Sequence, residues 1–264
     1  MTRWKVCHAL PTLRQWADAQ TGEQHAVLRQ RNYLRNPLPA GEGICVVCHS
    51  SAGEGFARCY QCEQHRMAGG DGLADVVAPI AYAVKGDQHA HALAVYKANR
   101  PSALAKRNLS SLAILFIAYH WECLARAVGG DFTHIASVPS TRGRPGSHPV
   151  DDVVTRRISI PAVSVKANAV YQSDDRRFHP DRFVVDAGID GARVLLVDDT
   201  WTTGSRIQSL ALALKRAGAA AVAIVVLGRH VNPGYGPSKA LVARLRQEPD
   251  FDLRKCVLES EPVS

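Results

Sequence analysis

Two adjacent carboxylates are the residues of this chain best placed to do chemistry. Asp198 and Asp199 follow four apolar residues at 194–197 and precede a hydroxyl-rich segment at 200–205. Four apolar residues in a row indicate a central parallel strand that is covered on both faces. Open α/β sheets bind ligands at the carboxyl ends of such strands, and a buried strand rarely ends in two acids without a reason. We therefore expect both carboxylates to contact the hydroxyl groups of a sugar.

The segment after the two acids carries groups that bind a phosphate. It reads Thr200-Trp201-Thr202-Thr203-Gly204-Ser205 and leads into a helix expected at Arg206–Ala217. The first amides of a helix are unpaired and lie at the positive end of its dipole, so they attract an anion. Together with the acids, this segment predicts a phosphosugar ligand. The alternative is an ordinary strand-to-helix turn that is capped by a Thr or Ser side chain.

Four of the seven cysteines form two Cys-x-x-Cys pairs with ten residues between them. They are Cys45, Cys48, Cys59 and Cys62. Two such knuckles supply four thiolates in a tetrahedral set, which suits a structural Zn²⁺ with no open coordination position. A redox pair or an iron–sulfur site is the alternative. The remaining cysteines are scattered, and we expect core or surface thiols at Cys7, Cys123 and Cys256.

Composition and charge bound the class of protein. The chain has 264 residues, of which 46% are hydrophobic and 21% charged, as is ordinary for a soluble globular protein. Its net charge of +8 fits a polyanionic ligand, either nucleic acid or a pyrophosphorylated sugar. The most apolar run, at 112–119, is shorter than the roughly 18–20 residues that span a bilayer. Without a visible signal peptide, we expect a cytoplasmic protein that contacts no membrane.

The elements that must position these residues alternate between strands and helices, which predicts an α/β fold with a parallel sheet and helices on both faces. We expect a basic helical arm at 1–40, the cysteine module at 41–70, an α/β domain at 76–230 and an extension at 231–264. Within the α/β domain, 76–130 would form a hood and 131–230 the core. The expected strands include Val76–Val84, His134–Val138, Ala162–Val165, Phe183–Val185, Val222–Leu227 and Arg254–Leu258, and the expected helices include Gln88–Arg100 and Ala103–Val128.

The stretch Arg193–Ser205 resembles the signature of the type I phosphoribosyltransferases, which bind phosphoribosyl pyrophosphate (PRPP) with a strand, two acids and a Thr-Thr-Gly loop. Those proteins usually have Thr or Ser where this chain has Arg206. With the cysteine knuckle, the segment 78–82 and a helix that ends near Tyr96-Lys97, the order resembles the ComF-like proteins, a group linked to DNA uptake in competent bacteria. This wider resemblance covers about 42–230.

The resemblance implies a role for each segment. Asp198 and Asp199 would hold the ribose hydroxyls, directly or through Mg²⁺. The 5′-phosphate would be bound by Thr200, Thr202, Thr203, Gly204 and Ser205. The loop at 139–146 carries Arg142 and Arg144 and is similar to the family's pyrophosphate loop, unless it is a plain basic surface turn. The long polar loop at 166–181 occupies the position of the family's flexible lid.

The lid would close on the pyrophosphate with Lys166, Arg176 and Arg177, unless it is a charged loop without a catalytic role. It lacks the Asn that these relatives often carry there. Two readings follow. One is a phosphoribosyltransferase that uses PRPP, Mg²⁺ and an unidentified acceptor. The other is a non-catalytic binding protein that acts on single-stranded DNA or a DNA-processing protein through the zinc knuckle and the basic arm. The oligomeric state stays open.

Overall fold

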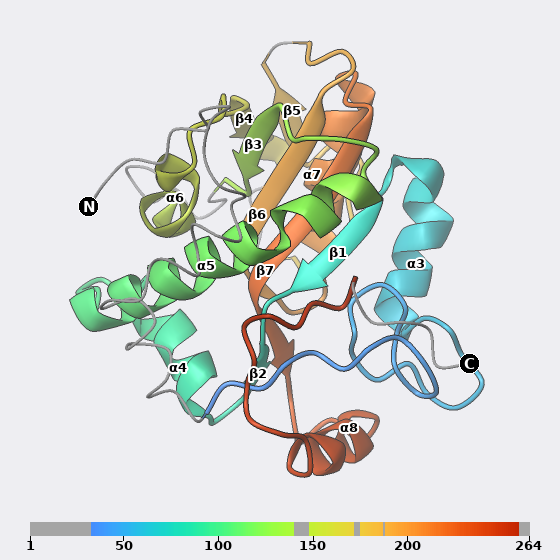
Figure 1. Cartoon of the computed structure of the whole chain (residues 1–264). Helices are drawn as coiled ribbons and strands as arrows, with labels where there is room; N and C mark the ends of the chain where they lie inside the picture. Colours follow the sequence, from blue (N-terminus) through green and yellow to red (C-terminus); the bar gives the residue numbers. More distant parts are fainter. Residues whose placement is uncertain (1–32, 140–147, 172–174, 187, 259–264) are drawn as a thin grey trace.

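The protein folds around one parallel sheet. The structure, a computed structural model, describes residues 33–139, 148–171, 175–186 and 188–258. The sheet has the order β1-β7-β6-β3, and β2 also pairs with β7 (Figure 1). Its strands are β1 (Val76–Pro79), β2 (Tyr82–Val84), β3 (His134–Ser137), β6 (Arg193–Trp201) and β7 (Ala221–Val231). A separate antiparallel pair consists of β4 (Val165–Ala167) and β5 (Phe183–Val185).

Helices cover both faces of the sheet, as predicted. They are α3 (Tyr60–Gly69), α4 (Gln88–Val95), α5 (Ala103–Ala127), α6 (Pro149–Val153), α7 (Ser205–Arg216) and α8 (Ser238–Leu245). Short 3₁₀ turns lie at Gly70–Gly72, Thr155–Arg157 and Ala169–Tyr171. Helix α5 crosses one face in Figure 1, while α7 packs on the other. None of the helices described here is long and apolar enough to cross a membrane.

The apolar run of β6 is divided between the two faces. Leu195 and Val197 pack into the core under α5, whereas Val194 and Leu196 pack into the core under α7. Alternate side chains of a strand point to opposite faces, so a strand buried on both sides must be apolar at every position. This requirement explains the continuous run at 194–197 and places β6 at the centre of the sheet.

Several predicted elements have different bounds in the structure. The strand expected at 76–84 is interrupted between β1 and β2, next to Pro79, which has no amide N–H for the ladder. The helix expected at 88–100 ends at Val95. Ala162 makes only an isolated bridge to Ile135, and β4 begins at Val165. The strand expected at 254–258 is absent, because these residues form turns.

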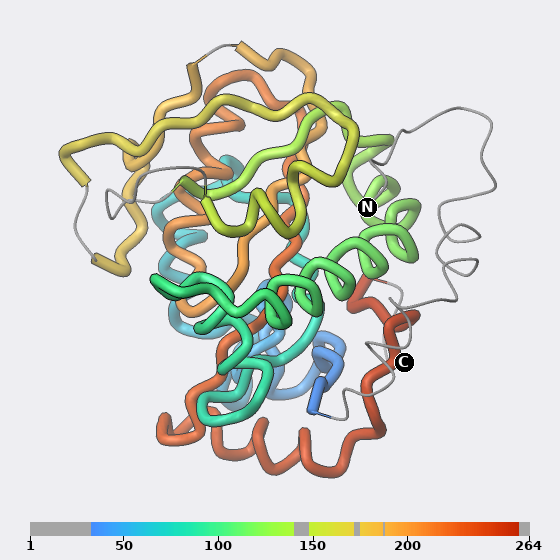
Figure 2. The backbone as a smooth tube through the Cα atoms, turned by 90° about the vertical axis from the view of Figure 1, so that its left-hand side faces the viewer, coloured from blue at the N-terminus to red at the C-terminus, as the bar shows by residue number. Residues whose placement is uncertain are grey.

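The two ends of the described chain lie side by side. Asn36 and Asp252 exchange two hydrogen bonds of 2.8 Å, and the corresponding segments run close together in Figure 2. The predicted arm falls mostly on residues 1–32, outside the described residues, and 33–40 form no helix. The C-terminal extension therefore packs against the segment that precedes the cysteine module.

Candidate functional site

The two acids lie in β6, near its carboxyl end, in unequal surroundings. Asp199 is buried, and its Oδ2 atom accepts hydrogen bonds from the Tyr96 hydroxyl at 2.6 Å and the Lys97 ammonium at 2.7 Å. Both donors follow the end of α4. Asp198 is half-buried, and its Oδ1 atom accepts the amide N–H of Asp199 at 2.8 Å. Among the described residues, Asp199 is therefore the one of the two acids that has a cation as a direct partner.

These surroundings separate the pKa values of the pair. Burial and the adjacent Asp199 charge raise the pKa of Asp198 to about 7. Burial also opposes ionisation of Asp199, but Lys97 and the hydrogen bond from Tyr96 outweigh it and hold its pKa below the ordinary value. The site thus holds one permanent carboxylate and one acid that titrates near neutrality.

His148 and Arg206 adjoin the acids, although the sequence did not single out His148. The ligating atoms of His148, Asp198 and Asp199 lie within 4.8 Å of one another. Arg206 donates from Nη2 to the backbone oxygen of Pro139 at 3.1 Å, and its positive charge lowers the Asp198 pKa, against the upward shift that burial and Asp199 cause. The Arg206 guanidinium is therefore oriented toward Pro139, which follows the end of β3.

Gly204 fixes the shape of the 200–205 loop. Its φ angle of 79° lies in the left-handed region, and a Cβ atom there would overlap the ring of Trp201. Trp201 is 1% exposed and packs under the loop. Helix α7 begins directly after Gly204, which offers no side-chain cap. The first amide of the helix, that of Ser205, donates to Thr203 Oγ1 at 3.4 Å, and the helix start is the kind of position where anions bind.

Two hydroxyl groups of the loop contact each other and a histidine of the cysteine module. Thr203 Oγ1 lies 3.1 Å from Ser205 Oγ, and the Ser205 oxygen lies 3.1 Å from Nε2 of His65 on α3. His65 is 2% exposed, and burial lowers its pKa to about 4, so its ring is neutral near pH 7. Sequence spacing gave no signal for this contact, which joins residues 140 positions apart.

The lid segment reaches the loop through its backbone. Thr203 donates to the carbonyl oxygen of Arg176 at 3.4 Å, while the side chains of Arg176 and Arg177 are exposed. A pocket of about 800 Å³ lies between this segment, α3 and Thr203. Arg182 Nη2 donates hydrogen bonds to two backbone oxygens of this segment, those of Asp175 and Arg177. Arg182 is buried, and its Nε and Nη1 atoms have no hydrogen-bond partner among the described residues.

Other predicted basic residues are elsewhere or outside the described residues. Lys166 lies on β4, is 73% exposed and pairs with Asp186 at 3.1 Å. Arg142 and Arg144 fall within 140–147, which the structure does not describe. The site residues that the structure brings together are thus the two acids, the 200–205 loop and the backbone of the lid segment.

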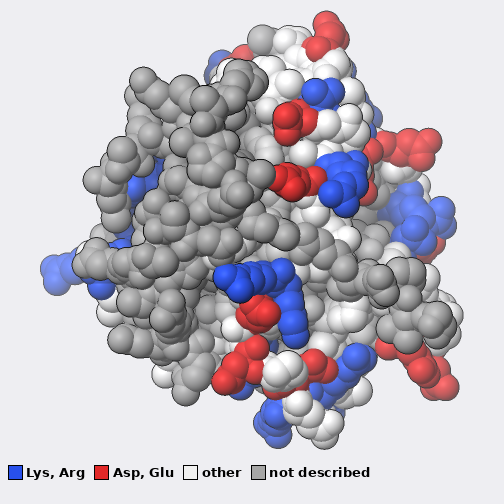
Figure 3. Space-filling view, in the orientation of Figure 1, with Lys and Arg blue, Asp and Glu red and all other residues white. Residues whose placement is uncertain are grey.

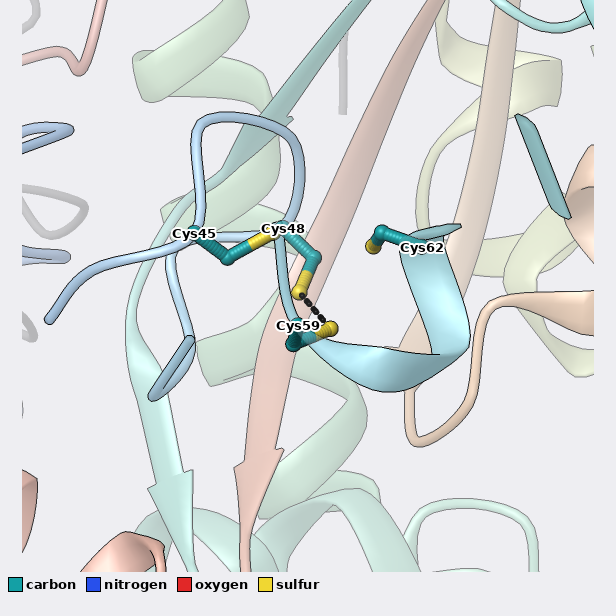
Figure 4. Close-up of side chains that lie close together, drawn as sticks. All are labelled: Cys45, Cys48, Cys59 and Cys62. Atoms are coloured by element: carbon teal, nitrogen blue, oxygen red, sulfur yellow. Dashed lines mark hydrogen bonds between the residues drawn. The ribbon is translucent and has the colours of Figure 1, made fainter. Parts of the chain in front are cut away.

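The four predicted cysteines converge into one cluster (Figure 4). Their sulfur atoms lie within 4.8 Å of one another, and those of Cys48 and Cys59 are 3.7 Å apart. Cys45, Cys48 and Cys62 are buried. Cys45 Sγ accepts the amide N–H of Val47 at 3.5 Å, a contact that favours a thiolate. Four free thiols at these separations fit a tetrahedral Zn²⁺.

The thiols of the cluster cannot all ionise together without a cation. Hydrogen bonds from the other three thiols lower the pKa of Cys45 strongly. The same contacts raise the pKa of Cys62 far above its ordinary value, because negative charge accumulates around it. A bound divalent cation would reduce this repulsion, so the four thiols form a donor set that could hold a metal ion.

Cys123 and Cys256 are core thiols, in agreement with one of the two expected states, but they are not scattered. Their sulfur atoms are 4.0 Å apart, and His120 lies beside them. His120 Nε2 contacts the backbone oxygen of Leu253 at 2.9 Å. This buried group ties the C-terminal segment to α5. Cys7 lies outside the described residues.

Surface charge gives no support for a nucleic-acid interface on the face in Figure 3. Among the described residues of that face, Lys and Arg alternate with Asp and Glu and form no continuous basic patch. The predicted basic arm lies mostly outside the described residues.

Two solved structures illustrate what this chain is similar to. A hypoxanthine phosphoribosyltransferase from Staphylococcus aureus matches with a TM-score of 0.32 and 11% identity, over 49% of this chain and 77% of that one. A purine phosphoribosyltransferase from Pyrococcus horikoshii Ot3 matches with a TM-score of 0.31 and 15% identity, over 48% and 88%. At these TM-scores the likeness assigns no activity. No protein-family model and no curated protein sequence matches the chain.

Proposed function

We propose that the protein binds PRPP and transfers its ribosyl phosphate group to an acceptor, with release of pyrophosphate. The observation that carries this proposal is the arrangement at the end of β6, where two unequal acids stand beside a glycine-shaped loop at a helix N-terminus. Sugar hydroxyls need hydrogen-bond acceptors, and a phosphate needs unpaired amides. This loop places both kinds of group within a few residues.

Each part of the ligand has a proposed partner. The 5′-phosphate would lie on the amides and hydroxyls of the 200–205 loop, and the ribose hydroxyls would contact Asp198 and Asp199. Arg206 and the lid arginines Arg176 and Arg177 would face the pyrophosphate. We place Arg142, Arg144 and Lys166 in the same role on the resemblance alone. Mg²⁺ bound with PRPP would neutralise the pyrophosphate, and a carboxylate with phosphate oxygens is the donor set it prefers.

The protein's task in this reaction is chiefly electrostatic. The bond between C1 and the pyrophosphate oxygen breaks, the pyrophosphate leaves with the electron pair, and the acceptor bonds to C1 and releases a proton to water. The transition state has oxocarbenium character, as in glycoside hydrolysis. Negative charge at Asp199 is already paired with Lys97, so Asp198 is the carboxylate left to face the developing positive charge.

We propose that the acceptor enters beside the acids. A pocket of about 430 Å³ is lined by Lys97 and Thr200, and its other walls come from residues 83–94 and His230. Lys97 contacts Asp199 directly, so this pocket adjoins the proposed ribose site. Apart from Thr200 and His230, its walls belong to the predicted hood, which fits recognition of an acceptor mainly by residues outside the core.

Pyrophosphate release tests the proposed turnover. The full chain is incubated with PRPP, Mg²⁺ and a panel of nucleobases, and inorganic pyrophosphate is measured. Acceptor-dependent release that disappears in Asp198→Asn/Asp199→Asn supports the transferase. Binding of PRPP without release across the panel would refute turnover and leave a binding protein. The DNA-directed alternative rests on the zinc knuckle and the basic arm, and the described residues offer no observation that favours it.

A further inference from the structure

Arg229 is a buried arginine whose location is unusual for its charge. It lies near the carboxyl end of β7, opposite Trp201 of β6, and is 6% exposed. A buried guanidinium is costly unless its N–H groups and its charge are both matched. The groups that accept its hydrogen bonds and balance its charge therefore indicate its role.

One side of the guanidinium contacts the cysteine cluster. Nε donates to the backbone oxygen of Cys48 at 3.0 Å, and Nη2 donates to Cys48 Sγ at 3.5 Å. Among the described residues Arg229 forms no ion pair with a carboxylate. The counter-charge of Arg229 is thus the cysteine cluster.

The other side of the guanidinium contacts the 200–205 loop. Nη1 donates to the backbone oxygens of Trp201 at 3.0 Å and Thr202 at 3.2 Å. The guanidinium is planar and rigid, so its two sides cannot move independently. A displacement of Cys48 would therefore shift the carbonyl oxygens that set the start of the loop.

A second contact joins the same two regions. His65 lies three residues after Cys62 on α3, and its Nε2 atom contacts Ser205 Oγ at 3.1 Å. The cysteine module therefore touches the loop at both of its ends, through Arg229 at Trp201–Thr202 and through His65 at Ser205.

We propose that Arg229 is a positioning residue that couples metal occupancy of the cysteine cluster to the conformation of the 200–205 loop. A zinc ion with four thiolates carries a net charge of −2, which fixes Cys48 and gives the guanidinium its counter-charge. Loss of the metal leaves the thiols free to separate, and Arg229 then loses the anchor that holds the loop. The coupling between metal occupancy and the order of the 200–205 loop does not require a bound ligand. Only the consequence for anion binding rests on the proposed function.

Hydrogen exchange of the full chain tests this coupling without measuring activity. Amides at 202–206 are compared in zinc-loaded protein and after removal of zinc by a chelator under reducing conditions. We expect exchange at these amides to accelerate about tenfold or more, in line with the loss of two charge-assisted hydrogen bonds. Amides of α5 at 109–124 serve as the internal reference. Unchanged exchange at 202–206 in zinc-free protein with a native α5 would overturn the proposal.

Variants separate Arg229 from a general effect of the knuckle. Arg229→Met should accelerate exchange at 202–206 while zinc stays bound. Arg229→Lys keeps the charge but lacks the planar guanidinium with donors on two sides, so its exchange rate should lie between those of wild type and Arg229→Met. Arg193→Met is the matched control, because Arg193 lies at the other end of β6 and contacts Asp131. Zinc-loaded Arg229→Met with wild-type exchange would contradict the assignment. If that variant does not fold, Arg229→Lys and the zinc comparison in wild type still decide.

Ligand linkage gives a second readout. If the proposed function holds, PRPP should slow zinc release to a chelator in wild type, because coupling between two sites is reciprocal. Arg229→Lys should reduce this protection. Wild type that binds PRPP yet releases zinc at the same rate would contradict the coupling. Absence of PRPP binding would instead count against the proposed function. The role of Arg229 would then be tested by the hydrogen-exchange comparison alone.

Discussion

Lys97 and Asp199 form a salt bridge of 2.7 Å between the end of α4 and the end of β6. The carboxylate of Asp199 is 7% exposed and the Lys97 side chain 33% exposed. Of the two acids, Asp199 is therefore a paired and structurally fixed group, whereas Asp198 remains the group with an elevated pKa. The two acids thus differ in their direct partners and in their pKa values.

Removal of Lys97 should destabilise the fold and raise the pKa of Asp199. In Lys97→Met, Asp199 would keep Tyr96 but lose its cation, next to a second carboxyl group. We expect a loss of about 2 kcal/mol in the free energy of unfolding, less than for a fully buried pair. Urea unfolding at pH 7 measures it. Lys106→Met, which breaks an exposed pair with Asp152 at 3.5 Å, should cost under about 1 kcal/mol. Equal losses in both variants would contradict this difference.

Replacement of Arg206 should affect the pyrophosphate end of the ligand more than the 5′-phosphate end. Arg206→Thr restores the family's hydroxyl but removes a guanidinium that contacts Pro139. We expect PRPP affinity to fall about tenfold, the value of one charge-assisted hydrogen bond, and ribose 5-phosphate affinity to change less. Calorimetric titration of both ligands gives the ratio. A similar loss for both would place Arg206 on the 5′-phosphate instead.

Metal analysis should find about one zinc per chain, bound by the four-cysteine cluster. Cys45→Ser removes one of four ligands and should lose most of the zinc together with stability. Cys123→Ser is the matched control, because Cys123 is a buried thiol outside the cluster. Full zinc content in purified Cys45→Ser, or its loss in Cys123→Ser, would contradict the assignment.

Acid should weaken the fold through His89. This side chain is 1% exposed, its Nε2 atom contacts the backbone oxygen of Leu227 at 3.0 Å, and burial lowers its pKa from 6.5 to about 4. The unfolded chain therefore binds the proton more tightly, and stability falls as pH drops from 6.5 toward 4. Between pH 7 and pH 5 this residue alone should cost about 2 kcal/mol.

Comparison with His89→Gln isolates that contribution. Glutamine keeps a donor for Leu227 and does not titrate, so its unfolding free energy should fall less between pH 7 and pH 5 than that of wild type. Parallel pH profiles for the two proteins would show that His89 is not the titrating group.

Local patterns were sufficient to predict the core of the site. The apolar run at 194–197 predicted a strand buried on both faces, and the position of the acids after it and the start of α7 followed from neighbouring residues. The cysteine spacing predicted the cluster for the same reason, because two short knuckles bring their own ligands together.

Long-range pairings could not be predicted from the sequence. A buried acid requires a cation, yet nothing in the spacing selects Lys97 among 32 Lys and Arg residues. Arg229 lies within the last residues of a strand whose pattern was apolar, so only its contact with Cys48 reveals its role. The bounds of β1 and β2 were missed because an edge strand can break without losing its register.

Titration of PRPP with Mg²⁺ into the zinc-loaded full chain, followed by calorimetry, tests the central claim most directly. We predict saturable binding of about one PRPP per chain, weakened about tenfold or more in Asp198→Asn/Asp199→Asn. Asp151→Asn, which alters an acid that bonds Ser137 and Thr155, should retain affinity. Absence of binding by the folded wild type, or equal affinity in the double variant, would contradict a PRPP site at the end of β6.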